Sequence, residues 1–358
     1  MLIFCLNIYT INAQILHDTT TFRQIEKCVD DIYGFRFADA KETCILINVK
    51  YPGHPAVYLL KGMIDYWENY PLLPNSPSVS SYIYEMHKCI NLSEKKNKTS
   101  DKAESLLINL CAKGMLLLFY SENDFSSEVF SLATSTYLGI RQSYEYSSVY
   151  YDFNFFTGLY DYYREAYPEA YPVYKAVAFL FPKGNMEKGL IELNKAGKYS
   201  VVLKAESYSF LLWINTNYEH NYELATYYSK LLYDLYPENV QYLGAYVKSL
   251  LLIKHYDEAE KLIESSDAKD KNLYYQAQLS IFKGVLQEKK YSNDKLAEQL
   301  YIKGIKSIST FGHYSYEFAA YGYFGLSRIS ERKGDSDFKK TYREKAIKLA
   351  DFKDVNFD

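Results

Sequence analysis

The sequence lacks the short patterns that mark most catalytic or cofactor-binding sites. Its five cysteines form no Cys-x-x-Cys pair, and its six histidines form no His-Glu-x-x-His helix. Neither a zinc site nor a thiol-redox centre is therefore indicated. No Gly-x-Ser-x-Gly elbow and no phosphate-binding Gly-Lys-Ser/Thr loop occurs. We expect no catalytic residue, no cofactor and no metal, and a protein that is not an enzyme.

An excess of charge of one sign is also missing. The chain has 41 Lys and Arg against 44 Asp and Glu, a net charge of −3. No global positive field for nucleic acid or anionic lipid results. The cations within 95–98 and 339–345 fall in polar or mixed-charge segments and are typical of solvated faces. We expect no nucleic-acid partner.

Long hydrophobic runs are scarce, and we expect no membrane span. The one distinctive apolar stretch is Leu2–Ile11, followed by Asn12-Ala13-Gln14. It resembles the core and cleavage point of a secretory signal, although the positively charged start is missing. We predict a signal peptide over 1–13 and a mature protein in the periplasm or at the cell envelope. The alternative is an ordinary first helix in a cytoplasmic protein.

Tyrosine, by contrast, is abundant, with 40 Tyr beside 20 Phe and only nine Pro. So aromatic a chain can bury a large core, which excludes disorder outside short connectors. At 358 residues the chain exceeds the roughly 250–300 at which a single core stops growing. Apolar residues recur at helical spacing, as in Leu243, Tyr246, Val247 and Leu250. We therefore predict an all-helical chain that grows in one dimension.

A four-residue phrase recurs along the chain. Tyr222-Glu-Leu-Ala225 is matched 34 residues later by Tyr256-Asp-Glu-Ala259, and Phe37-Ala-Asp-Ala40 repeats it near the start. Twelve residues after Ala225 and Ala40 come Pro237 and Pro52. The aromatic closes a turn between two helices, the alanine permits close crossing, and the proline ends the second helix. His220 and His255 then fall in the turns.

This period and pattern resemble the tetratricopeptide repeat family. The resemblance implies a right-handed superhelical array of antiparallel helix pairs, an α-solenoid, over 14–358. The best-matching repeats lie in 206–267. Helices in 314–350 would cap the array, because Phe338, Tyr342, Ala346 and Leu349 make one apolar stripe and the opposite side is polar.

Three segments depart from the phrase. Residues 68–100 contain three prolines and a polar run, which predicts an irregular insertion around a short helix near Tyr82–Asn91. Residues 101–119 are apolar on most sides and predict a buried helix. The segment 152–205 resembles the middle of a eukaryotic tetratricopeptide family of the mitochondrial outer membrane and inclusion-body clearance. Its Gly158, Gly184 and Gly189 equally fit turns and close helix approach.

Two residue types allow more than one interpretation. Cys28 and Cys44 fall on facing helices and would pair in an oxidising compartment. Buried free thiols are the favoured interpretation, since cysteine is among the most buried residue types. Tyrosines either fill gaps between helices or project into a binding groove, and filling is favoured for any single one.

The hypothesis that follows is a non-enzymatic scaffold that binds a protein or peptide on the inner face of the superhelix. Two alternatives stay open: an envelope-associated glycan- or nutrient-binding accessory protein, and an enzyme of unrecognised type. The first-helix positions expected to line the groove are Phe210, Ile214, Asn217, Tyr218, Lys248 and Leu251.

Overall fold

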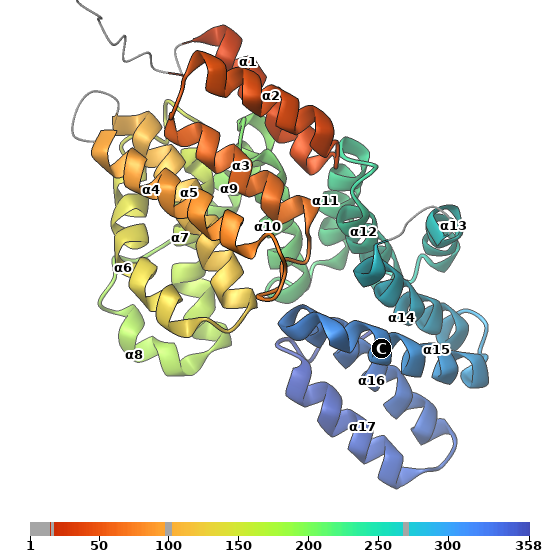
Figure 1. The fold of residues 1–358 in the computed structure, drawn as a ribbon. Helices are drawn as coiled ribbons and strands as arrows, with labels where there is room; N and C mark the ends of the chain where they lie inside the picture. The colour runs from red at the N-terminus through yellow and green to blue at the C-terminus, as the bar shows by residue number, and fades with distance from the viewer. Residues whose placement is uncertain (1–14, 16–17, 97–101, 268–271) are drawn as a thin grey trace, which may run out of the picture.

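Every regular element in the part of the chain that the structure describes is a helix (Figure 1). The computed structural model describes residues 15, 18–96, 102–267 and 272–358. No strand occurs among them, so the predicted all-α class is confirmed. The expected signal segment, 1–13, lies outside the described residues.

The helices form consecutive pairs in which each helix packs against the next. In chain order the pairs are α1 (Thr19–Tyr33) with α2 (Phe37–Lys50), α3 (Pro55–Glu68) with α4 (Val79–Lys96), α5 (Lys102–Glu122) with α6 (Ser126–Ser143), α7 (Phe153–Ala170) with α9 (Met186–Tyr199), α10 (Lys204–Asn217) with α11 (Tyr222–Leu235), α12 (Val240–Leu252) with α13 (Tyr256–Asp267), α14 (Leu273–Lys289) with α15 (Asp294–Ile308), and α16 (Tyr316–Arg332) with α17 (Ser336–Leu349). The short elements η2 (Pro172–Tyr174) and α8 (Lys175–Ala178) separate α7 from α9, and η3 (Ser309–Ser315) precedes α16. Neighbour-to-neighbour packing of this kind is consistent with an α-solenoid.

The turn inside six of these pairs is the same. One residue with positive φ lies two positions before the second helix, and the six are Phe35, Asp124, His220, Lys254, Ser292 and Gly334. Left-handed φ is uncommon outside glycine, so its recurrence at one register marks a structural repeat. The turn is closed by bonds such as that from the Arg36 N–H to the Asp31 carbonyl, 2.8 Å. His220 and His255 lie in these turns, as predicted.

The alanines of the repeated phrase lie at helix contacts. Ala40, Ala225 and Ala259 are each the fourth residue of a second helix, and each is 0% exposed. Ala297 has the same place in α15 and the same burial, and Gly189 has that place in α9. The small residue recurs there because its helix lies against the first helix of the pair.

The predicted insertion at 68–100 needs correction. Helix α4 is longer than the expected short helix, covers Val79–Lys96 and packs against both α3 and α5. Among the described residues of this segment, the irregular part is the connection between α3 and α4, at 69–78. Prolines at 71, 74 and 77 interrupt helix formation there, but the apolar residues after them resume a helical spacing. The segment is therefore the second half of a helix pair.

Helix α5 is the buried helix predicted for 101–119. Its length and apolar composition would also allow it to cross a membrane. In the structure, however, 78% of its most apolar 18-residue stretch is buried, and the helix packs against α3, α4 and α6. Here α5 acts as a core helix.

The last pair differs in part from the expected cap. Ala346 is buried and Lys340, Arg343 and Lys348 are exposed, as predicted for a polar outer face. Phe338, however, is 55% exposed and does not share the buried stripe. The chain after α17 covers other parts of the core instead, because Val355 and Phe357 are buried.

An aromatic seam joins the early helix pairs to the later ones. The Trp67 ring lies 6.2 Å from Tyr242, and the Tyr70 ring lies 5.7 Å from Tyr314. Tyr33 contacts both Trp67 and Tyr236. Polar bonds reinforce the seam, as the Asn239 Nδ2 donates to the Tyr33 carbonyl at 2.9 Å. Many tyrosines therefore fill gaps between helix pairs, which is the favoured of their two expected roles.

Candidate functional site

Four of the six residues predicted to line a groove are buried. Ile214 and Leu251 lie in the hydrophobic core. Asn217 is buried at the end of α10, and its amide donates to the Trp213 carbonyl. The Lys248 Nζ lies 2.9 Å from Glu317 Oε1 of α16, with its stem buried. Ile214, Lys248 and Leu251 do not form an open surface, whereas Asn217 lines a cavity of 490 Å³.

The other two predicted groove residues are half-buried against aromatic rings. Phe210 packs on Phe155 of α7 with ring centres 5.5 Å apart. Tyr218 packs on Phe352 at 5.2 Å, and Phe352 belongs to the segment after α17. Phe210 nevertheless lines a cavity of 290 Å³ and Tyr218 lines one of 490 Å³, so a groove at these two positions stays a prediction. The helical period of the sequence predicts that these residues point inward. It does not predict that later segments, such as the one with Phe352, pack against them.

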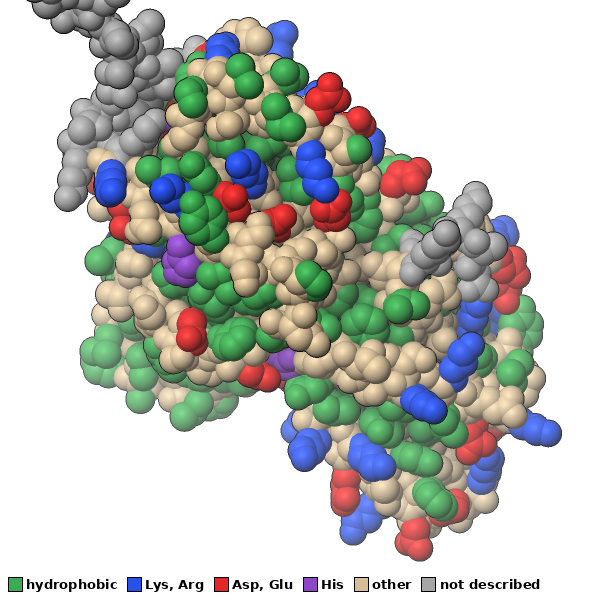
Figure 2. All heavy atoms as spheres, viewed as in Figure 1, with side chains coloured by type: hydrophobic (Ala, Val, Ile, Leu, Met, Phe, Trp, Pro, Cys, Tyr) green, Lys and Arg blue, Asp and Glu red, His purple; other side chains and the backbone are tan. Residues whose placement is uncertain are grey.

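The described surface has a large apolar region elsewhere, over α6 and α8. It contains Phe130, Leu138, Val173, Val177, Phe179 and Leu180, which are 49–78% exposed and which we name the α6–α8 surface. Figure 2 shows hydrophobic side chains gathered over α8 without acidic or basic side chains among them. Contiguous apolar patches of this kind mark interaction sites on water-exposed proteins.

Helix α6 exposes two large apolar side chains, Phe130 and Leu138, and its fully buried residues are small. Its buried residues are Thr136, Gly139 and Ser143. A Cβ at Gly139 would lie 2.8 Å from Leu110 Cδ2, so this face sits closely on α5. Phe130 and Leu138 lie off this contact and are exposed. Val129, Leu132 and Ile140 of the same helix are partly buried against the core, so α6 has apolar residues on two faces.

The α8 part of this surface is held in place by α6 and α7. The Phe181 ring packs edge-on against Tyr137 of α6, 5.1 Å between centres. The Tyr160 hydroxyl donates to the Pro182 carbonyl at 2.6 Å, and the Arg164 guanidinium donates to the Phe181 carbonyl at 3.1 Å. The exposed apolar side chains are thus displayed on an anchored backbone.

The sequence contains a signal for this surface that periodicity alone does not reveal. Residues 171–182 include a single charged side chain, Lys175, between Pro172 and Pro182. A segment that short forms only one turn of α8 and cannot turn every apolar residue inward. If the two prolines are interpreted only as helix boundaries, the exposure of the apolar residues between them is not predicted.

No metal-binding cluster is found among the described residues. No group of three or more His, Cys, Asp or Glu among the described residues is placed to hold a metal ion. His54 is buried beside Glu104, with 2.9 Å between His54 Nε2 and the carboxylate. Glu260, beside the repeat alanine, binds Lys290 and Tyr291.

No protein-family model matches this chain, and no curated protein matches it. The class of protein that the fold defines is therefore an array of packed helix pairs with an exposed apolar surface over α6 and α8.

Proposed function

We propose that this chain is a non-enzymatic protein-binding scaffold of the tetratricopeptide type, with its helix pairs arranged as a superhelix. Three features support this proposal. They are the four-residue motif that recurs at a 34-residue spacing, the small residue at the fourth position of several second helices, and the repeated left-handed turn. Scaffolds of this class bind partners through surfaces built from several repeats.

The α6–α8 surface is the proposed binding site, and its exposure is the observation that carries the proposal. Phe130, Val173, Phe179 and Leu180 each leave two thirds or more of their surface in water. Burial of such side chains contributes about 1.5–3 kcal/mol each. A partner that covers them would gain a hydrophobic interface centre.

A protein fits this surface better than a membrane does. Segments that lie on anionic membranes are rich in Lys and Arg on their polar face. Residues 171–182 carry one cation, Lys175, and Lys183 follows them. Neither lysine forms an ion pair with another described residue. We infer that the partner presents an apolar segment with a few acidic residues beside it.

The proposed location is the cell envelope, on the strength of the apolar residues 1–13 alone. N-terminal sequencing of the protein isolated from its native cells tests it. A chain that begins at Gln14 supports export, and a chain that retains Leu2 overturns it.

Site-specific photocrosslinking tests the scaffold. A photoreactive amino acid at Phe179 is expected to capture one protein in stoichiometric yield. A matched control places the same amino acid at Val49, which is exposed and apolar but lies on α2. The double substitution Phe179→Ser and Leu180→Ser should abolish copurification of that protein, whereas Leu46→Ser and Val49→Ser should not.

Two outcomes would overturn the proposal. One is capture of the same protein with equal yield from Val49 and from Phe179. The other is binding of the chain to anionic vesicles that is lost in the Phe179→Ser, Leu180→Ser variant, which would make the surface a membrane contact.

A further inference from the structure

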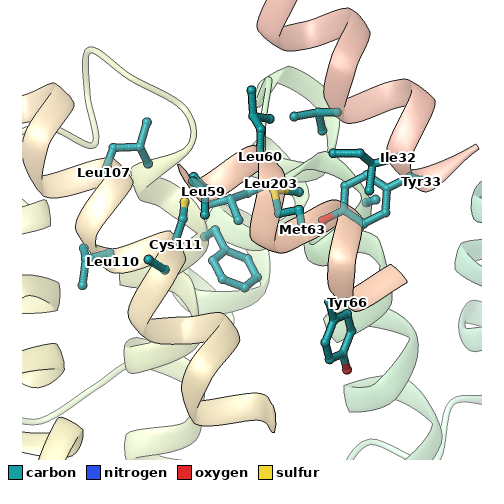
Figure 3. Close-up of a cluster of buried hydrophobic side chains, with 14 of the residues drawn as sticks. Ile32, Tyr33, Leu59, Leu60, Met63, Tyr66, Leu107, Leu110, Cys111 and Leu203 are labelled. Atoms are coloured by element: carbon teal, nitrogen blue, oxygen red, sulfur yellow. The ribbon is translucent and has the colours of Figure 1, made fainter. Parts of the chain in front are cut away.

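An apolar cavity lies between helices of the first five helix pairs, and none of the exposed residues of the α6–α8 surface lines it. Its volume is 290 Å³, and its walls come from α1, α3, α5, α6, α7 and α10. Figure 3 shows part of the wall, with Met63 of α3, Cys111 of α5 and Leu203 among the labelled side chains. An apolar cavity of about half this volume binds benzene in another protein.

One carboxyl group interrupts these apolar walls. Glu206, near the start of α10, lines the cavity together with Tyr33. The Tyr33 hydroxyl donates to Glu206 Oε1 at 2.8 Å. Among the described residues Tyr33 is the only hydrogen-bond partner of Glu206, so Oε2 retains its capacity to accept a hydrogen bond.

The hydroxyl of Thr136, another polar group of the wall, already has a partner. The Thr136 hydroxyl donates to the Leu132 carbonyl at 2.9 Å. No lysine or arginine lines the cavity. Burial raises the pKa of Glu206, although the bond from Tyr33 lowers it. An ionised carboxylate here is therefore poorly compensated and would gain strongly from a cation.

The carboxylates of a neighbouring cavity, unlike Glu206, have several partners or a buried histidine beside them. This cavity has a volume of 190 Å³ and shares Cys111 and Val202 with the first. Its carboxylates have partners, because Asp152 accepts from the N–H groups of residues 201–203 and Glu104 lies beside His54. Glu206 is thus the carboxyl that retains an unused acceptor.

We propose that the 290 Å³ cavity binds a small apolar molecule that carries one ammonium group, with Glu206 as the partner of that group. The apolar part lies among Met63, Phe155 and Leu203, and the ammonium donates to Glu206 Oε2. The mouth lies beside Leu118 of α5, which is 38% exposed and is the one exposed side chain in the wall. This site is independent of the α6–α8 surface and of the scaffold function.

Titration calorimetry with three probes of one eight-carbon chain tests the site: octylamine, octanol and octanoate. We expect octylamine to bind about 10- to 100-fold tighter than octanol, as a charged hydrogen bond requires. Octanoate should bind weakest. Glu206→Gln keeps the shape and an acceptor for Tyr33, and it should reduce octylamine binding to the octanol level without changing octanol.

A second variant keeps the test valid if Glu206→Gln does not fold. A Cβ at Gly114 meets no atom within 4 Å, and Gly114 lines the cavity, so Gly114→Leu should fill it without strain. This variant should lose both octylamine and octanol, whereas the exposed Glu42→Gln should keep both. Equal binding of amine and alcohol to the unaltered chain, or octylamine binding unchanged in Gly114→Leu, would overturn the proposal. Failure of the α6–α8 crosslink would leave it intact.

Discussion

Gly158 and Gly189 approach each other so closely that neither position can carry a side chain. A Cβ at Gly189 would lie 2.7 Å from the Gly158 carbonyl oxygen, and a Cβ at Gly158 would lie 2.9 Å from that of Gly189. The contact joins α7 to α9 and places Gly189 where other pairs have alanine. Gly158 and Gly189 thus permit close helix packing, which was the alternative to the family resemblance for the segment 152–205.

This contact predicts that Gly189→Ala destabilises the chain by about 1–3 kcal/mol, since backbone atoms must separate to admit the methyl group. The free energy of unfolding from urea titration measures the loss. Gly114→Ala is the matched control, because its methyl group meets open space within a helix and should stabilise by about 0.5–1 kcal/mol. Equal effects at the two sites would contradict the close approach.

Asn239 connects a helix cap to the aromatic seam. Its Oδ1 accepts from the N–H groups of Gln241 and Tyr242, and its Nδ2 donates to the Tyr33 carbonyl. Asn239→Ala should cost about 2–4 kcal/mol, the sum of a lost cap and an unpaired buried carbonyl. Asn293, exposed and used only as a cap, provides the comparison.

Asn293→Ala should cost about 1 kcal/mol. Chemical denaturation of both variants measures the difference. If the two substitutions cost the same, the bond from Asn239 to Tyr33 adds nothing to stability.

Glu288 is a buried carboxylate held by Arg328 and Tyr301. Arg328 donates to both of its oxygens at 2.8 Å, and the Tyr301 hydroxyl donates at 2.7 Å. Desolvation raises the pKa of Glu288, but the bonds from Arg328 and Tyr301 outweigh it and hold the pKa below its ordinary value. Glu288→Ala should cost about 3–5 kcal/mol, because it removes the buried partner of Arg328 and leaves that guanidinium only Asp358 and the Asn356 carbonyl.

The pH dependence follows from the lowered pKa. The folded chain binds this proton less readily than the unfolded chain, so the stabilisation is present above the unfolded value of about 4.3. It is lost as pH falls through the folded pKa. The stability gap between the unaltered chain and Glu288→Gln should therefore shrink below about pH 4. Glu298→Gln, in the exposed pair with Lys333, should change stability by less than about 1 kcal/mol at any pH.

Cys28 and Cys44 are buried free thiols, which confirms the favoured interpretation. Burial raises the pKa of Cys44 to about 11 and raises that of Cys28 further. Both should stay protonated and unreactive at pH 8. In a Cys5→Ser variant, mass spectrometry should find no alkylation of the four described cysteines by iodoacetamide until urea is added. A Cys28–Cys44 disulfide in the purified chain would contradict this.

Local chemistry made part of the structure predictable. An aromatic residue, a small residue and a proline at fixed spacing predict a turn, a close helix contact and a helix end. The burial of Ala40, Ala225 and Ala259 at helix contacts was therefore predicted correctly. The same reasoning predicted an irregular segment over 68–100. It gave the three prolines more weight than the helical spacing of the apolar residues after them, where α4 begins at Val79.

The helical character of this chain and the turns of its helix pairs are encoded locally, since they depend on residues within about one repeat of each other. Which faces stay open is set by the packing of distant segments. Ile214 and Leu251 are covered, Phe179 and Leu180 are exposed, and Glu206 faces a cavity. Contacts between residues more than 150 positions apart, such as Tyr33 with Glu206, decide burial, and no local spacing encodes them.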